Sequence, residues 1–317
     1  MAETKKVGWI GTGVMGVSMC SHVMKRWPED EERRAHLINK GGYETFVFNR
    51  TKEKADVLVE LGATWCESAK EVAEQADIIF TIVGMPADVN EVYFGEQGIF
   101  KGAKEGSIVV DMTTTEPALA IKIYEEAQKL GISALDAPVS GGDVGARNAT
   151  LAIMVGGDEP VFQEILPLFQ IMGDQEKIVY MGSAGAGQHT KMANQIMIAS
   201  TMVGVVESMM YAMKAGLDVG AMINVIGKGA AMNWSLINYG PRILKGDFNP
   251  GFFIKHFLKD MSIALEEAKR MNLALPGLAL ANQFYTAAKA LGLETLGTQG
   301  LYKVYEHLNG LDKKEEE

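Results

Sequence analysis

The amino-acid sequence predicts an α/β fold, a doubly wound and mostly parallel sheet followed by an all-α domain. Three observations support this prediction. Strand-like and helix-like segments alternate through the first half, a Gly-x-Gly-x-x-Gly motif follows the first strand, and strand signals nearly vanish after a glycine cluster at residues 182–187. The 317 residues suffice for two domains, each with its own core. We place the boundary in the glycine cluster, so the predicted domains are residues 1–183 and 184–317.

The strand-like segments of the first half are short and apolar. They are expected at residues 7–10, 44–48, 78–83, 108–111, 133–138, 151–155 and 177–180. Helical patterns separate them, at residues 52–61, 69–75, 86–93, 117–130 and 159–172. Because apolar strands alternate with amphipathic helices, we expect a mostly parallel sheet that is covered on both faces.

The glycine motif lies between a short strand and a helical segment, which is the context that dinucleotide binding requires. Gly11 permits a tight turn, Gly13 lets the backbone approach a pyrophosphate, and Gly16 lets the helix pack closely on the strand. The free N–H groups at the start of the helix, at Val14 and Met15, face the anion. The alternative is a glycine-rich turn that binds no ligand. We predict a Rossmann-type domain in which these five residues bind a dinucleotide.

The segment after the second strand favours NADP over NAD as the cofactor. NAD-specific sites usually carry an acidic residue there, which binds the ribose 2′-hydroxyl and repels a 2′-phosphate. Here Arg50 can pair with a phosphate, and Asn49 and Thr51 can donate hydrogen bonds to it. The nearest acidic residues are Glu44, inside the strand, and Glu53, in the next helix.

The spacing of this segment departs from the usual pattern. The ribose-site residue usually follows the glycines by about 20 residues, whereas a clearly longer gap separates Gly16 from Asn49. The extra residues form a charged stretch near residues 26–40. We interpret this stretch as a surface loop or an extension of the first helix.

Charge and composition exclude several classes of partner. The net charge of −10 argues against a nucleic acid, because binding phosphates needs a basic face. No apolar run reaches the ~20 residues that span a bilayer, so no membrane segment is expected. Cys20 and Cys66 are the only cysteines and lack metal-ligand spacing, so no metal site is predicted. These cysteines, and N-terminal residues without the apolar core of a signal peptide, indicate a cytoplasmic protein.

A polar cluster marks the start of the long helical stretch after the boundary. Lys191, Asn194 and Gln195 are spaced i, i+3 and i+4, so their side chains project from one face of a helix. The alternative is a solvated first helical turn. Residues 195–214 are rich in Met and nearly apolar, which is typical of a core or a subunit contact. We therefore expect a homodimer or homotetramer.

In four blocks the sequence resembles the β-hydroxyacid dehydrogenases, the relatives of 3-hydroxyisobutyrate dehydrogenase. The blocks are residues 11–16, 136–142, 187–195 and 259–260. The resemblance covers nearly the whole chain and implies a 6-phosphogluconate dehydrogenase-like architecture. It also implies an NAD(P)-dependent enzyme that moves a hydride between a nicotinamide and a carbon bearing a hydroxyl group β to a carboxylate. Asn49-Arg50-Thr51 and Lys255-His256 are similar to the glyoxylate and succinic semialdehyde reductase branch of the family.

The resemblance assigns catalytic and substrate-binding roles. Lys191 is implied as the general acid/base, because desolvation beside a cofactor can lower the pKa of a lysine toward the working pH. The residues that resemble the family's clamp for the substrate carboxylate, with hydroxyl and backbone N–H donors, are Ser140, Gly141 and Gly142. A simple turn that closes a strand would have the same composition. The residues implied to orient the substrate are Asn194 and Gln195.

Further cofactor contacts are predicted outside the glycine motif. Lys259 is similar to a family lysine that reaches back to the cofactor from the helical domain, although taken alone it would be interpreted as a surface lysine. The remaining predicted contacts are Val83, Gly84, Met85 and Thr114.

Two residues depart from the family pattern, and three functions are compatible with the sequence. Asp143 follows the clamp where a neutral residue is expected, and Ala149 replaces a usual glycine. The favoured function is the reduction of a small semialdehyde or keto acid, with oxidation of the β-hydroxyacid as its reverse. One alternative is a non-catalytic dinucleotide-binding module, against which the retained Lys191 argues. The other is a dehydrogenase or reductase of a larger acid or an imine, whose relatives are expected to carry extra basic residues or to lack this lysine.

Overall fold

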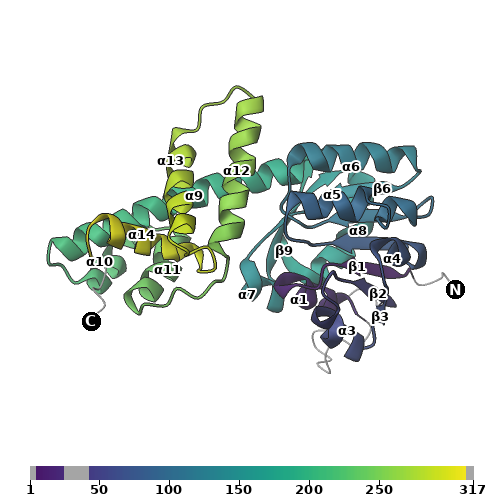
Figure 1. Cartoon of the computed structure of the whole chain (residues 1–317), viewed down its shortest axis with the longest axis horizontal. Helices are drawn as coiled ribbons and strands as arrows, with labels where there is room; N and C mark the ends of the chain where they lie inside the picture. Colours follow the sequence, from purple (N-terminus) through teal and green to yellow (C-terminus); the bar gives the residue numbers. More distant parts are fainter. Residues whose placement is uncertain (1–4, 25–42, 312–317) are drawn as a thin grey trace. The chain divides into compact units, whose positions relative to one another are not determined.

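The computed structural model describes residues 5–24 and 43–311, which belong to two compact units (Figure 1). The units are Met1–Lys191 and Met192–Glu317. The charged stretch near residues 26–40, for which a loop or a helix extension was predicted, lies outside the described residues.

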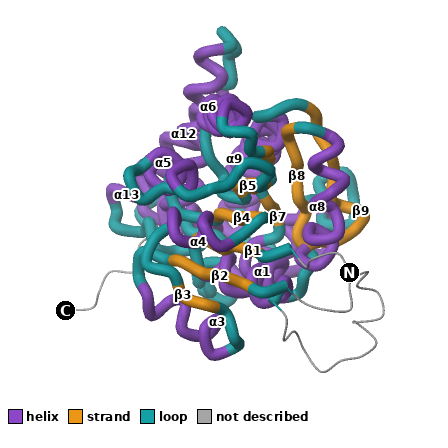
Figure 2. The backbone as a smooth tube through the Cα atoms, turned by 90° about the vertical axis from the view of Figure 1, so that its right-hand side faces the viewer, coloured by secondary structure: helices purple, strands orange, loops and turns teal. Residues whose placement is uncertain are grey.

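The first unit is built on one sheet, to which the described residues contribute nine strands. The strands are β1 (Val7–Ile10), β2 (Thr45–Phe48), β3 (Thr64–Trp65), β4 (Ile78–Thr81), β5 (Ile108–Asp111), β6 (Ser133–Asp136), β7 (Val139–Ser140), β8 (Leu151–Gly157) and β9 (Gly173–Gly182). Their order is β3-β2-β1-β4-β5-β6-β8-β7, and β9 pairs with β8. Figure 2 shows part of this sheet, including the neighbouring strands β3, β2, β1 and β4. The strands from β3 to β6 pair in parallel, whereas β8 is antiparallel to β6 and β7. The strand order reverses between β1 and β4, which is the topological switch point of a doubly wound sheet.

Helices cover both faces of this sheet. They are α1 (Val14–Val23), η1 (Lys52–Ala55), α3 (Asp56–Glu60), α4 (Ala69–Gln75), α5 (Pro86–Phe94), η2 (Ile99–Lys101), α6 (Pro117–Lys129), α7 (Gly142–Arg147) and α8 (Glu159–Met172). Ile79 of β4 packs in one core with Val72 of α4. The next residue, Phe80, packs in a second core with Met19 of α1 and Phe169 of α8. Because successive strand residues point to opposite faces, the two cores lie on the two faces of the sheet, and the predicted doubly wound fold is confirmed.

The strand predictions need corrections at the sheet edges and at the ends that carry the site. β3 and β7 were not predicted, because a strand of two residues is too short for a recognisable pattern. β9 begins at Gly173 rather than at residue 177. The strands predicted at residues 78–83 and 133–138 end at Thr81 and Asp136, where the chain turns into loops.

The second unit is built from helices, as predicted. They are α9 (Ala186–Lys214), α10 (Val219–Ile226), α11 (Trp234–Leu244), α12 (Ile254–Arg270), α13 (Pro276–Ala290), η3 (Thr298–Gly300) and α14 (Leu301–Leu308). Its main core joins Met202 of α9, Phe257 of α12, Tyr285 of α13 and Leu301 of α14. α13 packs against both α12 and α14. The all-α second domain is therefore confirmed.

Helix α9 corrects the expectation that no segment could span a membrane. An 18-residue window of this 29-residue helix reaches a mean hydropathy of 1.5, so the helix is long and apolar enough to pass that test by length and composition alone. The sequence argument considered only uninterrupted apolar runs, and α9 is interrupted by single polar residues. Two of these, Gln195 and Glu207, form hydrogen bonds to Asp260 and Tyr305, and Met202 and Met210 lie in the core. These contacts attach α9 to the other helices of its unit.

The two compact units divide inside α9, after Lys191, whereas the predicted boundary precedes this helix. The physical reason is that the first turns of α9 are bonded to the first unit. The Gln188 amide contacts the loop after β5, and the backbone N–H of Gln188 donates to Asp136 at the end of β6.

Candidate active site

The glycine loop between β1 and α1 has the shape that dinucleotide binding requires. Gly11 has φ +98°, and a Cβ atom there would lie 2.1 Å from the carbonyl oxygen of Ile82. A Cβ atom on Gly16 would lie 1.9 Å from the carbonyl oxygen of Gly11. A Cβ atom on Gly13, in contrast, would meet nothing within 4 Å among the described residues. Gly11 and Gly16 are thus required by the fold, whereas Gly13 leaves open space in front of the first N–H groups of α1, beginning at Val14.

Asn49 connects this loop to the end of β2. The backbone N–H of Thr12 donates to Asn49 Oδ1 at 3.0 Å, and Asn49 Nδ2 donates to the carbonyl oxygen of Thr51 at 2.7 Å. The sequence predicted Asn49 and Thr51 as donors to a phosphate. In the structure the Asn49 amide joins the backbone of Thr12 to that of Thr51, and its role toward a phosphate stays a prediction.

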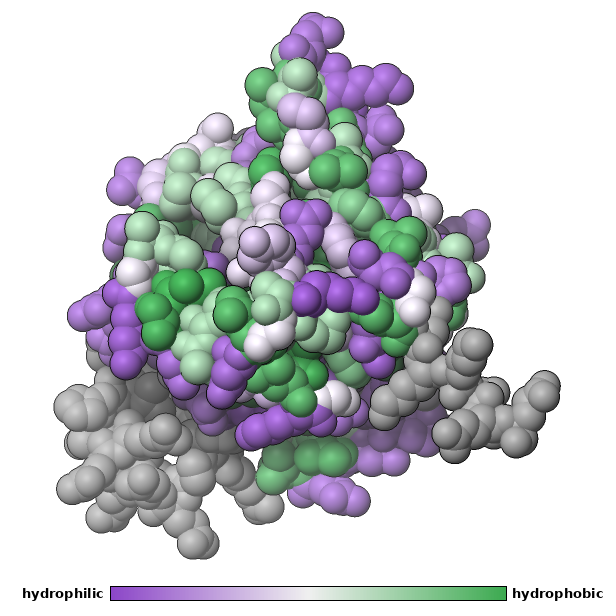
Figure 3. Space-filling view, turned by 90° about the vertical axis from the view of Figure 1, so that its left-hand side faces the viewer, coloured by the Kyte–Doolittle hydropathy of each residue, from purple (hydrophilic) through white to green (hydrophobic). Residues whose placement is uncertain are grey.

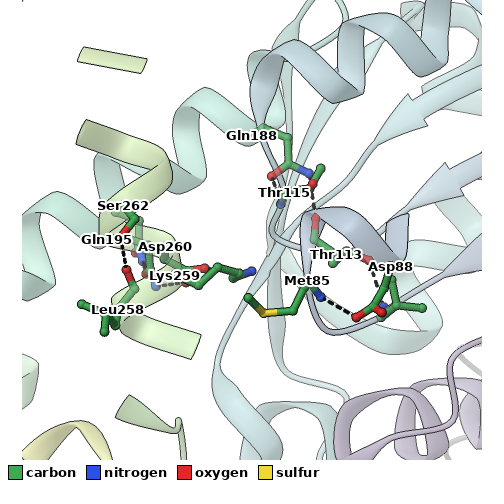
Figure 4. Close-up of polar contacts among 12 residues, drawn as sticks. Met85, Asp88, Thr113, Thr115, Gln188, Gln195, Leu258, Lys259, Asp260 and Ser262 are labelled. Atoms are coloured by element: carbon green, nitrogen blue, oxygen red, sulfur yellow. Dashed lines mark hydrogen bonds and ion pairs between the residues drawn. The ribbon is translucent and has the colours of Figure 1, made fainter. Parts of the chain in front are cut away.

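Arg50 extends from the same segment into solvent. Its side chain is 87% exposed, and one guanidinium nitrogen lies 3.0 Å from Asp88 Oδ1. The other carboxylate oxygen of Asp88 accepts a hydrogen bond from the backbone N–H of Met85 at 3.0 Å (Figure 4). An ion pair this exposed contributes little stability, so a phosphate group can replace Asp88 as the partner of Arg50 at small cost.

The loops after β4 and β5 are tied to each other. The backbone N–H of Val83 donates to Thr113 Oγ1 at 3.0 Å, and the backbone N–H of Thr113 donates to Asp111 Oδ1 at 3.0 Å. Thr81 Oγ1 donates to the same Asp111 oxygen at 2.8 Å. The predicted cofactor residues on these loops are Val83, Gly84 and Met85, before α5, and Thr114, after β5.

Asp111 is a buried carboxyl group beneath these loops. Only 2% of the residue is exposed, and its Oδ2 atom has no hydrogen-bond partner among the described residues. Burial, and to a smaller extent the neighbouring Asp136 carboxyl group, raise its pKa to about 6 against the hydrogen bonds from Thr113 and Thr81, which lower it. The two carboxyl groups line one small cavity with Tyr124.

Asp136 anchors the start of α9 on the end of β6. Its Oδ1 accepts from the backbone N–H of Gly185 and its Oδ2 from that of Gln188, both at 2.8 Å. A Cβ atom on Gly187 would lie 2.4 Å from the carbonyl oxygen of Met154, so glycine is required for this approach. Burial raises the pKa of Asp136, and the two backbone donors oppose that shift. Lys191, the predicted general acid/base, follows on the same helix and is 6% exposed.

The predicted carboxylate clamp forms the turn between β7 and α7. Ser140 ends β7, and Gly141 and Gly142 have φ values of +135° and +61°. Both glycines hold a conformation that other residues rarely adopt. The unusual Asp143 is paired with Arg147, whose guanidinium donates to Asp143 Oδ2 at 2.7 Å.

Ala149, the other departure from the family pattern, lies in the turn after α7. Its φ of +54° places it in the left-handed region, where glycine is favoured. The usual glycine at this position therefore has a backbone reason, and the alanine is accommodated at a conformational cost.

In the second unit, side chains from α9 and α12 form a polar cluster. Asn194 Nδ2 donates to Gln195 Oε1 at 2.7 Å, and Gln195 Nε2 donates to Asp260 Oδ2 at 2.5 Å. Lys259 Nζ lies 3.0 Å from Asp260 Oδ1 (Figure 4). The side chains of Lys259 and Asp260 are 8% and 1% exposed, so Lys259 is not a surface lysine. The structure thus brings together three predicted residues through Asp260, which the sequence analysis did not assign to the site.

The predicted site residues therefore fall into two sets, one in each unit. The first set contains the glycine loop, the ribose-site segment, the clamp and Lys191, and the second contains Asn194, Gln195 and Lys259. Four polar residues that bond to the neighbourhood of these sets were not predicted. They are Asp111, Asp136, Gln188 and Asp260. Three of the four lie inside blocks of family resemblance, which was the available signal. Among the described residues, no group of three or more His, Cys, Asp or Glu side chains could hold a metal ion.

Two family models match the chain. The NAD binding domain of 6-phosphogluconate dehydrogenase matches residues 33–182, and the NAD-binding domain of NADP-dependent 3-hydroxyisobutyrate dehydrogenase matches residues 185–305. The first model begins after the glycine loop, so the geometry of that loop is an independent indication of dinucleotide binding.

Relatives match over nearly the whole chain. A probable mitochondrial 3-hydroxyisobutyrate dehydrogenase-like protein of Arabidopsis thaliana is 50% identical over 96% of this chain and 86% of its own. The 2-hydroxy-3-oxopropionate reductase of Escherichia coli is 37% identical over 95% of this chain and 97% of its own. The solved structure of Mycobacterium tuberculosis 3-hydroxyisobutyrate dehydrogenase with L-serine is 25% identical, with a TM-score of 0.82 over 96% of this chain and 99% of that one.

Proposed function

This chain belongs to the β-hydroxyacid dehydrogenase family, and we propose that it is an NADPH-dependent reductase of a small semialdehyde or keto acid. As a member of that family it is a nicotinamide-dependent oxidoreductase that acts on the CH–OH group of a hydroxyacid. The proposal adds the preferred cofactor, the substrate class and the residue that transfers the proton. The observation that carries it is the burial of Lys191, 6% exposed, on a helix whose start Asp136 anchors to the dinucleotide-binding unit.

The residues of the first unit fit a dinucleotide. The open space at Gly13 and the helix start at Val14 suit a pyrophosphate, and Gly11 and Gly16 hold the loop in that shape. When bound, the reduced nicotinamide supplies a hydride to the carbonyl carbon of the substrate. Arg50 is assigned to the 2′-phosphate of NADP, because it is a cation at the end of β2 with a partner that is easily replaced.

Lys191 is assigned to proton transfer. As the carbonyl carbon accepts the hydride, negative charge develops on the carbonyl oxygen, and Lys191 Nζ donates a proton to that oxygen. The product is the corresponding hydroxyacid, which is a β-hydroxyacid where the aldehyde group of the substrate is β to the carboxylate. In the reverse direction the neutral amine of Lys191 accepts the hydroxyl proton.

The substrate carboxylate is assigned to the turn at the end of β7. Ser140 offers a hydroxyl group, and the positive φ values of Gly141 and Gly142 turn this short segment sharply. The charge of Asp143, next in the chain, is balanced by Arg147. A small substrate with one carboxylate suits a clamp whose neighbouring charges are already paired. The amides of Asn194 and Gln195 are assigned to orienting the substrate.

We also propose that the chain forms a homodimer or homotetramer through its helical unit. Tyr211 of α9, Val225 of α10 and Trp234 of α11 are 76%, 72% and 65% exposed. Figure 3 shows apolar residues, in green, gathered between polar ones on the face that it displays. Apolar surface of this kind marks a contact site in soluble oligomers. Sedimentation at micromolar concentration tests this assignment, and a single species of 34.4 kDa would contradict it.

A substrate screen tests the proposed activity. NADPH and NADH oxidation are each measured with glyoxylate, succinic semialdehyde, tartronate semialdehyde and methylmalonate semialdehyde. We expect at least one of these to be reduced, with NADPH as the better donor. The matched control is an aldehyde of the same length without the carboxylate, which the clamp cannot hold. Equal rates with the control aldehyde would contradict the clamp, and inertness toward all four acids would contradict the proposed substrate class.

A further inference from the structure

Gln188 is a fully buried amide that the sequence analysis left without a role. It lies in the first turn of α9 and is 0% exposed. Its Nε2 atom donates to the carbonyl oxygen of Thr113 at 2.7 Å, and its Oε1 atom accepts from the backbone N–H of Thr115 at 3.0 Å (Figure 4). The backbone N–H of Gln188 is itself held by Asp136. One residue thus connects the start of α9, the end of β6 and the loop after β5.

The two side-chain bonds fix both sides of a single loop residue. Thr113 and Thr115 are 2% and 0% exposed, so their backbone groups depend on this amide for satisfaction. Thr114, between them, is the half-buried member of the three. The hydroxyl group of Thr113 in turn accepts a hydrogen bond from the backbone N–H of Val83. The conformation of the loop that carries the predicted cofactor contact Thr114 is therefore set by Gln188.

The bridge requires the chemistry of an amide. Thr113 presents an acceptor and Thr115 presents a donor, so the bridging group must donate with one atom and accept with the other. A primary amide does both in one plane, an ionised carboxylate only accepts, and an aliphatic side chain does neither. A protonated carboxylic acid has the same pattern of one donor and one acceptor.

We propose that Gln188 is a positioning residue of the reaction, which holds the Thr113–Thr115 loop and the helix turn that carries Lys191 in one fixed arrangement. Lys191 follows Gln188 by three residues, so the two side chains project from neighbouring positions on one helix face. Loss of the bridge frees the loop on one side and the lysine-bearing turn on the other. This inference rests on the proposed function for the identity of the lysine, but the bridge itself is a property of the ligand-free fold.

The test compares Gln188→Glu with Gln188→Leu. At pH 8 the ionised carboxylate of Gln188→Glu faces the Thr113 carbonyl oxygen, and kcat is expected to fall at least tenfold, with a higher KM for NADPH. As the pH decreases, burial and the nearby Asp136 and Asp111 carboxyl groups favour the protonated acid, which restores both bonds. The ratio of Gln188→Glu to parental kcat is therefore expected to rise toward one by about pH 5.5, whereas the ratio for Gln188→Leu stays low at every pH.

A measurement without cofactor or substrate separates this inference from the proposed function. Hydrogen exchange of the Thr115 amide in the ligand-free protein is expected to be at least tenfold faster in Gln188→Leu. In Gln188→Glu it is expected to be faster at pH 8 and parental at pH 5.5, after correction for the intrinsic exchange rate. Gln97→Glu, which makes the same change at an exposed position, is expected to match the parent in every measurement.

Each outcome bears on one claim. Unchanged exchange at Thr115 in Gln188→Leu would overturn the bridge. Faster exchange with parental kcat and KM would overturn its role in the reaction. An inactive parent would contradict the proposed function, and the exchange result would still decide whether Gln188 fixes the loop.

Discussion

The two units of this chain hold their predicted site residues in place with different kinds of contact. In the first unit the predicted cofactor contacts are mainly backbone groups, in glycine turns, at a helix start and in loops. Single buried side chains such as Asp136 and Gln188 hold neighbouring backbone segments in place. In the second unit a chain of side chains runs from Asn194 through Gln195 to Asp260 and Lys259. A site formed by backbone groups depends on the backbone conformation and on the space left for the ligand, whereas a side-chain cluster depends on charge and hydrogen bonding. Substitutions are therefore expected to act differently in the two units.

Buried carboxyl groups illustrate the same contrast. Asp111, in the first unit, keeps one oxygen without a partner among the described residues, and burial raises its pKa to about 6. Asp260, in the second unit, is equally buried, and one of its oxygens also lacks a hydrogen-bond partner among the described residues, but that oxygen lies 3.0 Å from the Lys259 ammonium group and the other accepts a hydrogen bond from Gln195. Removing the charge is expected to help the first unit and to harm the second.

The largest expected effect is on proton transfer by Lys191. Lys191→Ala is expected to lower kcat by ~10²–10⁴-fold, the usual loss when a general acid/base is removed, with nearly unchanged affinity for NADPH. Lys191→Arg is expected to fail as well, because a guanidinium does not release its proton near neutral pH. Steady-state kinetics and a fluorescence titration with NADPH measure the two quantities. Retention of more than about a tenth of the parental kcat by Lys191→Ala would rule out this role.

The second effect tests the side-chain cluster. Asp260→Asn removes the negative charge 3.0 Å from the nearly buried Lys259 ammonium group. Removing one partner of a buried ion pair typically costs about 3–5 kcal/mol of unfolding free energy. Glu306→Gln is the matched control, because its ion pair with Lys303 in the same unit is partly exposed, with side-chain exposures of 23% and 43%, and a loss below about 1 kcal/mol is expected. Equal losses in the two variants, measured by urea denaturation, would contradict the cluster's dependence on charge.

A third effect concerns the cofactor. Arg50→Ala is expected to reduce the preference for NADPH over NADH by ~10–100-fold, the value of a charge-assisted contact of about 1.5–3 kcal/mol. The loss is expected in kcat/KM for NADPH alone, because NADH has no 2′-phosphate. Folding stability is expected to stay near the parental value, since the exposed pair with Asp88 contributes little. A parental preference in Arg50→Ala, or a parent that prefers NADH, would refute the assignment.

The glycine loop offers a matched pair of substitutions that tests the site formed by backbone groups. Gly16→Ala places a Cβ atom 1.9 Å from the Gly11 carbonyl oxygen, which is expected to cost about 1–3 kcal/mol of stability. Gly13→Ala meets nothing within 4 Å, so stability is expected to change by less than about 0.5 kcal/mol. Its methyl group instead occupies the space assigned to the pyrophosphate, and the Kd for NADPH is expected to increase at least tenfold. Parental NADPH binding by Gly13→Ala would place the pyrophosphate elsewhere.

The smallest expected effect is the pH dependence that arises from Asp111. A folded-state pKa of about 6, above the ordinary value of 3.8, means that protonation of Asp111 stabilises the fold. That contribution is fully present below pH 3.8 and is lost as the pH rises through about 6. Asp111→Asn mimics the protonated form and is expected to be about 1 kcal/mol more stable than the parent at pH 7.5. The difference is expected to vanish near pH 4.

Urea denaturation of both proteins across this range measures the Asp111 effect. A constant difference, or a variant less stable than the parent at pH 7.5, would show that the buried carboxylate is compensated.

Local patterns in the sequence were sufficient to predict the glycine loop and most strands of the first unit. Gly11, Gly13 and Gly16 impose a backbone path over a few residues, so their spacing, between an apolar strand and a helical pattern, predicted the loop. The strands were readable for the same reason, since apolar runs are local patterns. The division of the helical half into its separate helices had weaker local signals.

The supporting contacts could not be predicted, because they join residues that are distant in the sequence. Thr12 and Asn49 are 37 residues apart, Gln195 and Asp260 are 65 apart, and Gln188 lies 75 residues from Thr113. No local pattern specifies such a pair. The family resemblance marked the neighbourhoods of these residues, and only the tertiary structure identified the partners.

The central claim is that this chain reduces a carboxylate-bearing semialdehyde with the hydride of NADPH. The most direct test uses NADPH that carries deuterium at the transferred position of C4, with each of the four acids of the screen as the substrate and mass spectrometry of the product. We expect one non-exchangeable deuterium on the carbinol carbon of the hydroxyacid for each NADPH oxidised. Oxidation of NADPH without deuterium in the product, or no hydroxyacid at all, would contradict the claim.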